Sequence, residues 1–347
     1  MAVMTATGTS TPVGASGRRR ALVGLLLLLG AVAGSLLLSL SVGSRALDVG
    51  TVWRVLFVPD GSDAAVIVHD LRLPRTVLGL LVGMALGAGG ALMQGHTRNP
   101  LADPGLLGVT NGAAFAVVIA IYLFSVTNIQ GYVWFALAGA AIASAVVFAV
   151  GASGGRGPSP LALVLAGTAV SALLASFTTA LVIRDQQALD VYRFWVVGSV
   201  AGRDQAIATQ IAPFIVVGLL VALAHAPSLN VLSLGEDVAR GLGQHVGRTR
   251  VIGLAAIMLL TGAATAACGP IWFVGLVVPH VARFFTGPDH RWLVPYSALL
   301  GAVLLLCSDV VGRVVARPGE LQVGIVLALI GGPFFIALVR RRRLVAL

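Results

Sequence analysis

Two closely spaced arginines in the segment Leu71-Arg72-Leu73-Pro74-Arg75 are the first residues whose type and spacing suggest chemistry. A guanidinium group stays charged and can hold a carboxylate through two parallel hydrogen bonds. Arg72 and Arg75 could therefore bind acidic groups of a partner. The alternative is that both are solvated positive charges that anchor the end of a helix.

A second polar segment, residues 233–243, predicts a short helix with a defined start. Ser233 and Glu236 have the S-x-x-E spacing of a capping box. Glu236 and Arg240 stand four residues apart, so they can form an ion pair on one helix face.

The same segment carries an apolar stripe, because Leu234, Val238 and Leu242 recur at four-residue intervals. Such a helix is too short to cross a membrane, and its stripe needs another surface to cover it. A groove on a cytosolic partner would do so. The alternative is packing against the rest of the same chain.

Several kinds of chemistry are excluded or unsupported. All 23 basic residues are arginine, so the lysine of a phosphate-binding loop is missing and the chain cannot be its own P-loop ATPase. Cys268 and Cys307 lie in apolar segments and indicate neither a disulfide framework nor a thiolate metal site. The six histidines show no ligand spacing, so we predict no metal site, and no cluster of acid, base and metal ligands indicates an enzyme.

The elements that must position these residues are membrane helices. The 347-residue chain is 58% hydrophobic and 10% charged, whereas soluble domains carry roughly 25% charged residues. The net charge of +10 could indicate nucleic-acid binding, but many arginines lie in short loops between apolar runs, where the positive-inside rule places them. We therefore predict no nucleic-acid partner.

Ten apolar stretches are suited to membrane helices. The first, residues 21–42, is too long for a cleavable signal and is read as a retained span. The piece 271–285 is the shortest and is interrupted by prolines, so it could be a partial crossing. The stretches are 21–42, 76–94, 105–126, 132–151, 161–183, 205–226, 251–268, 271–285, 294–312 and 321–339.

Alternating these spans from an inner start divides the charges unequally. The inner segments hold 14 arginines against four acids, and the outer segments hold nine arginines against nine acids. Because charge was not used to choose the spans, this asymmetry supports an even number of crossings with both termini in the cytoplasm. Both halves contain a Gly- and Pro-interrupted segment, which weakly favours inverted repeats.

Four runs of sequence resemble one known family in order along the chain. They are RLPRTVLGLLVGMALGAGGALMQGHTRNPLADPGLLGVTNGA, LSLGEDVARGLGQHVG, GPIWFVGLVVPHVARFFTGPDHR and SDVVGRVVARPGELQVGIVLALIGGPFFIALVRRR. Together they cover residues from about 70 to 342. The chain resembles the FecCD-type permeases, the ABC importer family that moves ferric siderophores, haem and cobalamin.

The resemblance implies an all-α membrane protein of about ten helices with type II ABC importer permease architecture. It implies a permease subunit, without its own ATPase site, that translocates a bulky metal chelate, with a ferric siderophore favoured over haem or cobalamin. The expected organisation is an N-terminal cytoplasmic segment 1–20 without regular structure, a permease domain 21–342 with a coupling-helix loop at about 230–250, and a cytoplasmic tail 343–347.

The partners implied by the resemblance are a second permease subunit, identical or paralogous, two ATPase subunits and an extracytoplasmic substrate-binding protein. ATP and Mg²⁺ would be bound by the ATPase, and no cofactor by this chain. The localisation implied is a bacterial cell membrane. A secondary transporter driven by an ion gradient is the alternative from another class; it would need an ionisable residue near mid-membrane, whereas the acids here stay near span ends.

The resemblance also carries over site residues. It implies that Arg72, Arg75 and Arg313 receive carboxylates of the binding protein. The residues implied in contact with the ATPase are Leu234, Gly235, Glu236, Ala239, Leu242 and Gly243. The residues implied near the pathway or an inner gate are Asn99, Leu101, Ser159, Pro160, Thr168 and Ser171, although the family's hydroxyl residues are not cleanly matched at Ser159-Pro160.

Overall fold

The computed structural model describes residues 15–340 except 44, 59 and 154–158, and the described residues form helices and no strand. Each predicted apolar stretch coincides with a helix. Eight described helical segments are long and apolar enough to cross a membrane, and α5 and α12 are shorter apolar helices. The ten helices are α1 (Ala15–Ser41), α4 (Leu73–Thr97), α5 (Val109–Phe124), α6 (Ile129–Ala152), α7 (Pro160–Arg184), α9 (Gln205–Ser233), α11 (Val246–Cys268), α12 (Val274–Thr286), α13 (His290–Val315) and α14 (Val323–Arg340).

Short elements join these ten helices at both ends of the bundle. Two of them, α2 (Val49–Phe57) and α3 (Asp63–Val66), are followed by a π-helical turn, η1 (Ile67–Arg72), that leads directly into α4. The others are a 3₁₀ turn, η2 (Pro104–Leu107), and the helices α8 (Gln186–Trp195) and α10 (Glu236–Gly241).

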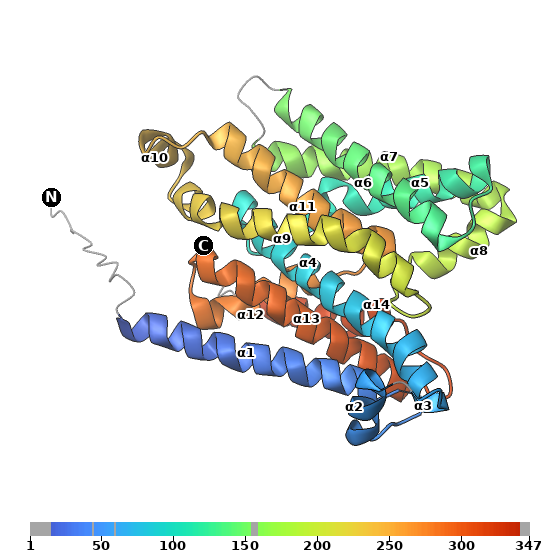
Figure 1. The fold of residues 1–347 in the computed structure, drawn as a ribbon. Coiled ribbons are helices and arrows are strands. Elements are labelled where there is room, and N and C mark those ends of the chain that lie inside the picture. Colours follow the sequence, from blue (N-terminus) through green and yellow to red (C-terminus); the bar gives the residue numbers. More distant parts are fainter. Residues whose placement is uncertain (1–14, 44, 59, 154–158, 341–347) are drawn as a thin grey trace, which may run out of the picture.

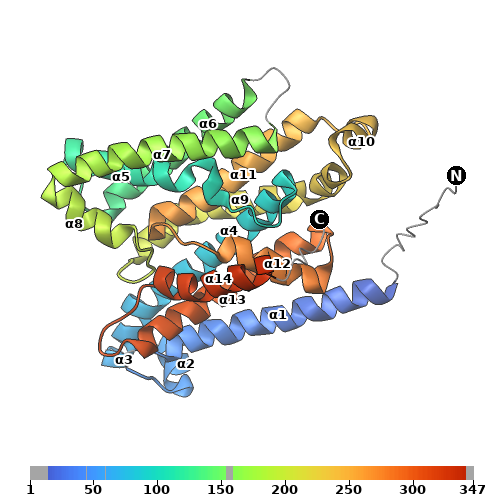
Figure 2. The ribbon, with the colours of Figure 1, turned by 180° about the vertical axis from the view of Figure 1, so that it is seen from behind.

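Helix α4 forms the centre of the bundle. It packs against α9, α11, α12 and α13, and most of its length is buried, whereas α1 and α7 lie at the periphery (Figures 1 and 2). Glycines make this position possible. A Cβ on Gly87 would overlap the backbone of Ser297 in α13, and one on Gly90 would overlap the backbone of Gly275 in α12. Small residues at such crossings let helices approach closely in a membrane.

Replacing Gly90 with alanine is therefore expected to destabilise the bundle, because the new methyl group meets backbone that cannot move away. We expect a loss of about 1–3 kcal/mol of unfolding free energy. The measurement is the thermal unfolding midpoint in detergent. Gly34→Ala in α1 is the matched control, because a Cβ there has no neighbour within 4 Å; equal midpoints for both variants would contradict the close-contact explanation.

The segment between α4 and α5 turns back into the bundle instead of running along its surface. Arg98 ends α4 with a φ of 49°, and Gly108 begins α5 with a φ of 75°. Gly108 lies against Val147 of α6 and Ser171 near the middle of α7. Irregular backbone is tolerated at membrane depth where protein buries it. Helix α5 consequently starts inside the bundle, which explains why it has only 16 residues.

The predicted piece 271–285 is also shorter than a full span. Helix α12 begins at Val274, after a non-helical stretch in which Gly269 and Phe273 have φ values of 74° and 71°. The partial crossing expected from the prolines is therefore what the structure shows.

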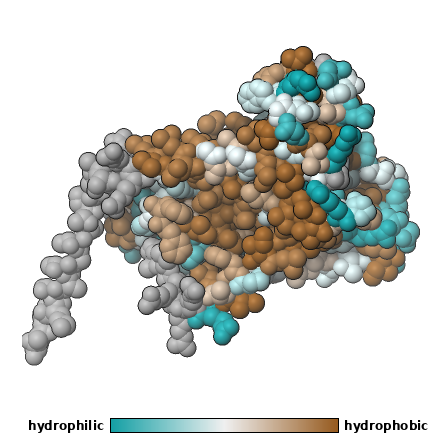
Figure 3. All heavy atoms as spheres, turned by 90° about the horizontal axis from the view of Figure 1, so that it is seen from below, coloured by the Kyte–Doolittle hydropathy of each residue, from teal (hydrophilic) through white to brown (hydrophobic). Residues whose placement is uncertain are grey.

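The two ends of the bundle differ in what they carry. The start of α1, the end of α14 and α10 lie at one end, and α2 and α3 lie at the other (Figure 1). We call these the α10 end and the α2 end. The described ends of the chain thus share one end, as an even number of crossings requires. The face seen in Figure 3 is largely hydrophobic, and its hydrophilic residues gather mostly toward the α2 end.

The predicted terminal segments are only partly covered by this description. Helix α1 begins at Ala15, inside the segment 1–20 that was expected to lack regular structure. Residues 1–14 and the predicted tail 343–347 lie outside the described residues.

Candidate functional site

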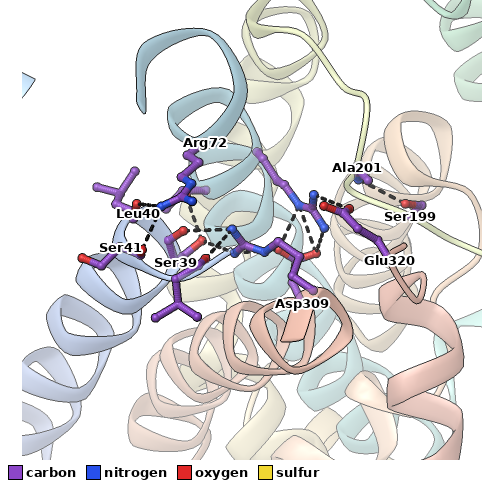
Figure 4. A network of polar contacts seen from close by, with 12 residues as sticks. Ser39, Leu40, Ser41, Arg72, Ser199, Ala201, Asp309 and Glu320 are labelled. Atoms are coloured by element: carbon purple, nitrogen blue, oxygen red, sulfur yellow. Dashed lines mark hydrogen bonds and ion pairs between the residues drawn. The ribbon is translucent and has the colours of Figure 1, made fainter. Parts of the chain in front are cut away.

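At the α2 end, three arginines donate hydrogen bonds to the carboxyl-terminal end of α1. The last carbonyl groups of any helix have no partner within the helix, and cations are favoured there. Arg72 and Arg313 meet this need, and Arg317 donates to Gly43 just beyond the helix. We call these three residues the arginine clamp. Figure 4 shows Arg72 pointing toward Leu40 and Ser41 at this helix end.

Arg72 is the last residue of η1, and its side chain points toward the end of α1. Its Nη1 donates to the carbonyl oxygens of Leu40 at 2.6 Å and Ser41 at 2.8 Å, and its Nη2 donates to the carbonyl of Arg45. The residue is only 5% exposed. Its charge is therefore satisfied by backbone dipoles, without a carboxylate.

Arg313 of α13 reaches the same helix end from the other side. Its Nη1 lies 3.0 Å from the carbonyl oxygens of Ser39 and Val42, and its Nη2 donates to the Ser39 hydroxyl at 2.9 Å. Arg317, one turn later, donates to the carbonyl of Gly43. Arg313 is 3% exposed, so it too points into the protein.

Arg75 binds two carboxylates of its own chain. Its Nη2 and Nε lie 2.7 and 3.0 Å from the two oxygens of Asp309, and its Nη1 lies 2.7 Å from Oε2 of Glu320. Asp309 also pairs with Arg313 at 3.0 Å. The Asp309 side chain is 2% exposed, so both ion pairs are shielded from water.

The structure thus brings together Arg72, Arg75 and Arg313, the three residues carried over from the resemblance, but all three bind partners within the chain. Positive charge is nevertheless in excess. Arg75 and Arg313 pair with the carboxylates of Asp309 and Glu320. Arg72 and Arg317 donate to backbone carbonyl groups instead, which leaves two positive charges without an acidic partner in the cluster. A cavity of about 550 Å³, lined in part by Glu320, Trp195 and Arg203, opens beside it.

At the α10 end, the predicted capping box is wrong. Helix α9 continues to Ser233, whose hydroxyl donates to the carbonyl of Asn230 at 2.7 Å, and so Ser233 cannot cap the next helix. Helix α10 begins after Gly235, which has a φ of 115° and no side chain to cap with. The capping pattern failed because the preceding helix extends further than its composition suggested. The predicted pair of Glu236 with Arg240 is confirmed at 3.2 Å.

The predicted apolar stripe is present and faces outward. Leu234, Val238 and Leu242 are 61%, 49% and 65% exposed, so the described chain does not cover them. Ala239 faces the other way and is fully buried against the bundle. Of the six residues expected to meet an ATPase, Leu234 and Leu242 have large exposed apolar side chains, whereas Glu236 is engaged by an arginine of α11, Arg250.

The expected gate residues lie in the segment after α4 and on α7 with its N-cap. Asn99 lies just beyond α4, where its side chain accepts from the backbone N–H of Leu101 at 2.9 Å. Ser159 caps the start of α7 by accepting from Ala162 N–H at 3.1 Å, and Pro160 is the first residue of that helix. Thr168 is exposed further along α7, and Ser171 lies beside Gly108.

Sequence reasoning missed several buried polar residues near the α10 end. Gln94 accepts from Arg283 Nη1 at 2.7 Å and donates to the carbonyl of Gly275 at 3.1 Å. The Nε2 atoms of His96 and His225 lie 3.3 Å apart. A polar residue inside an apolar span was the available signal for Gln94, His96 and His225, but their partners are distant in sequence.

The fold and the two polar ends together define the class of the protein, an all-helical protein with many helices long and apolar enough to cross a membrane. The sequence model of the FecCD transport family matches residues 27–341, and the chain belongs to this family.

The chain is similar to permeases of iron-chelate transport systems. It is 46% identical over 326 residues to the ferric enterobactin transport system permease protein FepD of Escherichia coli K12, covering 94% of this chain and 96% of that one. It is 44% identical to the iron(3+)-hydroxamate import system permease protein FhuB of Bacillus subtilis 168, covering 88% and 80%. A solved structure of a metal-chelate type ABC transporter in an inward-facing conformation superposes with a TM-score of 0.82 at 28% identity, covering 92% and 99%.

Proposed function

We propose that the chain is the transmembrane permease subunit of an ATP-binding cassette importer and moves a bulky ferric siderophore. The observation that carries the proposal is the exposed stripe of α10, Leu234, Val238 and Leu242, which needs a cytosolic groove to cover it. The partner that fits is an ATPase that binds ATP and Mg²⁺. The names of the relatives, which concern enterobactin and hydroxamate chelates, support a ferric siderophore over haem or cobalamin.

In this proposal the α10 end and both chain termini face the cytoplasm of a bacterial cell. A second permease copy or a close paralogue would complete the route. Support comes from α7, where Thr168, Ser176 and Thr179 are exposed on a peripheral helix and would face the partner or the route. Asn99, Leu101, Ser159, Pro160, Thr168 and Ser171 remain the proposed lining of the inner half of that route.

The α2 end would receive the substrate-binding protein. Support comes from the two uncompensated positive charges of the cluster around Asp309, because acidic groups on a docking protein would balance them. The clamp residues Arg72 and Arg313 are buried, so Arg75 and the exposed Arg317 are the members nearest to a docked partner. Their charges would set the register and rate of encounter more than the affinity.

Reconstitution tests the proposal directly. The permease is placed in lipid vesicles with a candidate ATPase and binding protein, and uptake of radiolabelled ferric enterobactin, ferric hydroxamate, haem and cobalamin is compared. Uptake should require ATP and both partners, and a ferric siderophore should be preferred. Uptake driven by a proton or sodium gradient without the partners would overturn the proposal. Preference for haem or cobalamin would overturn the assignment of a ferric siderophore as the cargo.

Two single substitutions at the α2 end should change docking in opposite directions. Arg317→Gln removes one excess positive charge, whereas Glu320→Gln adds one by removing a carboxylate that pairs with Arg75. We expect the association rate of the binding protein to fall about two- to fivefold in the first variant and to rise by a similar factor in the second, at low salt.

Both effects should shrink at about 1 M salt, where the Debye length is about 3 Å. The measurement is surface plasmon resonance on the reconstituted permease. Association rates that change in the same direction in both variants, or that do not depend on salt concentration, would contradict docking at this cluster.

A further inference from the structure

Helix α10 is attached to the bundle by two glycine bends and a small number of polar contacts. Gly235 and Gly243, on either side of it, have φ values of 115° and 80° and no neighbouring atoms where a side chain would stand. Glycine reaches such φ values at little steric cost and can change conformation more readily than other residues. Without further contacts, a force applied to α10 would bend these hinges and leave the bundle in place.

An ion pair, together with the buried Ala239, opposes such bending. Oε1 of Glu236, the first residue of α10, is in close contact with Nη2 of Arg250 in α11. The Arg250 side chain is 8% exposed, so the pair is shielded from water on the arginine side. Gln244 adds neutral hydrogen bonds to Ser228 and Thr249 at 3.0 and 3.1 Å.

Arg250 lies one turn before a tight contact between α11 and α4. A Cβ at Gly253 would overlap the imidazole ring of His96, so the two helices touch there without space between them. The His96 ring is stacked on that of His225 in α9, with ring centroids 5.2 Å apart. A displacement of the first turns of α11 therefore has to move the adjacent ends of α4 and α9 or disrupt this packing.

Helix α4 continues from this contact to the opposite end of the bundle. It runs unbroken from Leu73 to Thr97, and Arg75 near its start holds Asp309 of α13. Helix α4 thus contacts α11 one turn after Arg250 at one end, and its other end contributes Arg75 to the arginine cluster.

We propose that the Glu236–Arg250 ion pair is the joint through which movement of α10 reaches the membrane helices, with Arg250 as a positioning residue. This inference rests on the proposed function, because it presumes that an ATPase moves α10. It also assigns Glu236 a role different from direct contact with the ATPase. The exposed leucines receive the force, and the ion pair passes it to α11 and from there to α4.

The test compares cargo moved per ATP hydrolysed in vesicles that contain the permease, the candidate ATPase and the binding protein. Glu236→Gln and Arg250→Gln should each lower this ratio about tenfold, within the range by which residues in coupled networks change coupling. The double variant should lose less than the sum of the two single variants, because both remove the shared Glu236–Arg250 interaction. Arg240→Gln is the matched control, since Arg240 pairs with the same carboxylate but is exposed.

Normal ratios in both single variants would overturn the inference. So would additive losses in the double variant, or an equal loss in Arg240→Gln. Glu236→Asp and Arg250→Lys keep both charges and should lose less than the neutral variants, and this order decides the question if a neutral variant assembles poorly. Failure of the unaltered protein to show ATP-dependent uptake would instead reject the proposed function, so the two failures are distinguishable.

Discussion

The variant that combines Leu234→Asp and Leu242→Asp is expected to lose association with the ATPase by about 100-fold or more, and ATP-driven uptake with it. Both leucines are more than half exposed in the isolated chain, so their burial would come from the partner. Burying one leucine contributes about 1.5–3 kcal/mol, and each 1.4 kcal/mol is worth about tenfold in affinity. Replacing both by charged groups removes this contribution and adds a cost of desolvation.

Association is measured by titrating labelled ATPase onto the permease in lipid nanodiscs. Gly247→Asp is the control for charge, because it places a carboxylate close by, outside the stripe, where a new side chain meets no atom within 4 Å. If the stripe is the contact, Gly247→Asp should bind within about twofold of the unaltered protein. Equal binding by the double leucine variant would show that the stripe faces lipid or a different protein.

The variant Asp309→Asn is expected to lose about 3–5 kcal/mol of unfolding free energy, because one buried carboxylate serves two buried arginines. Asp309 accepts from Arg75 at 2.7 Å and pairs with Arg313 at 3.0 Å. An amide of the same size keeps the volume and removes the charge, so the buried Arg313 would lose its acidic partner and Arg75 would keep only Glu320.

Chemical denaturation in detergent micelles gives this free energy. Glu320→Gln is the matched substitution, because Glu320 also pairs with Arg75 but its side chain is 36% exposed. An exposed pair of this kind is worth about 0–1 kcal/mol. Similar losses for the two variants would mean that burial does not set the strength of this network.

Much of the fold could be predicted because the apolar runs are long and local. The ten predicted stretches coincide with helices, since a run near 20 residues with few charges has little alternative in a membrane. The shortness of α5 and α12 could be predicted from the sequence only in part. Prolines and glycines marked the start of α12, whereas nothing in the run 105–126 showed that η2 would occupy its first residues.

The candidate site was predicted in position but not in its contacts. The clustering of Arg72, Arg75 and Arg313 came from resemblance, and their burial could not be foreseen, because the partners of Arg75 are more than 230 residues away in sequence. The stripe on α10 was predictable because it depends on a local four-residue period. The capping-box prediction failed because the residue at which a helix ends depends on packing beyond the local pattern. The expected inverted repeat stays a prediction.

The arginine clamp sets an order in which the chain can be completed during synthesis. Helix α1 leaves the ribosome first, and Arg72, which donates to its last two carbonyl groups, follows about 30 residues later. Arg313 and Arg317, which donate to the carbonyls of Ser39, Val42 and Gly43, are about 270 residues further along. At roughly 5–20 residues per second these donors arrive about a quarter of a minute to a minute later. Until then the carbonyl groups of Ser39, Val42 and Gly43 must rely on water or lipid headgroups, so a nascent chain that stalls before α13 exposes an incompletely capped helix end to membrane quality control.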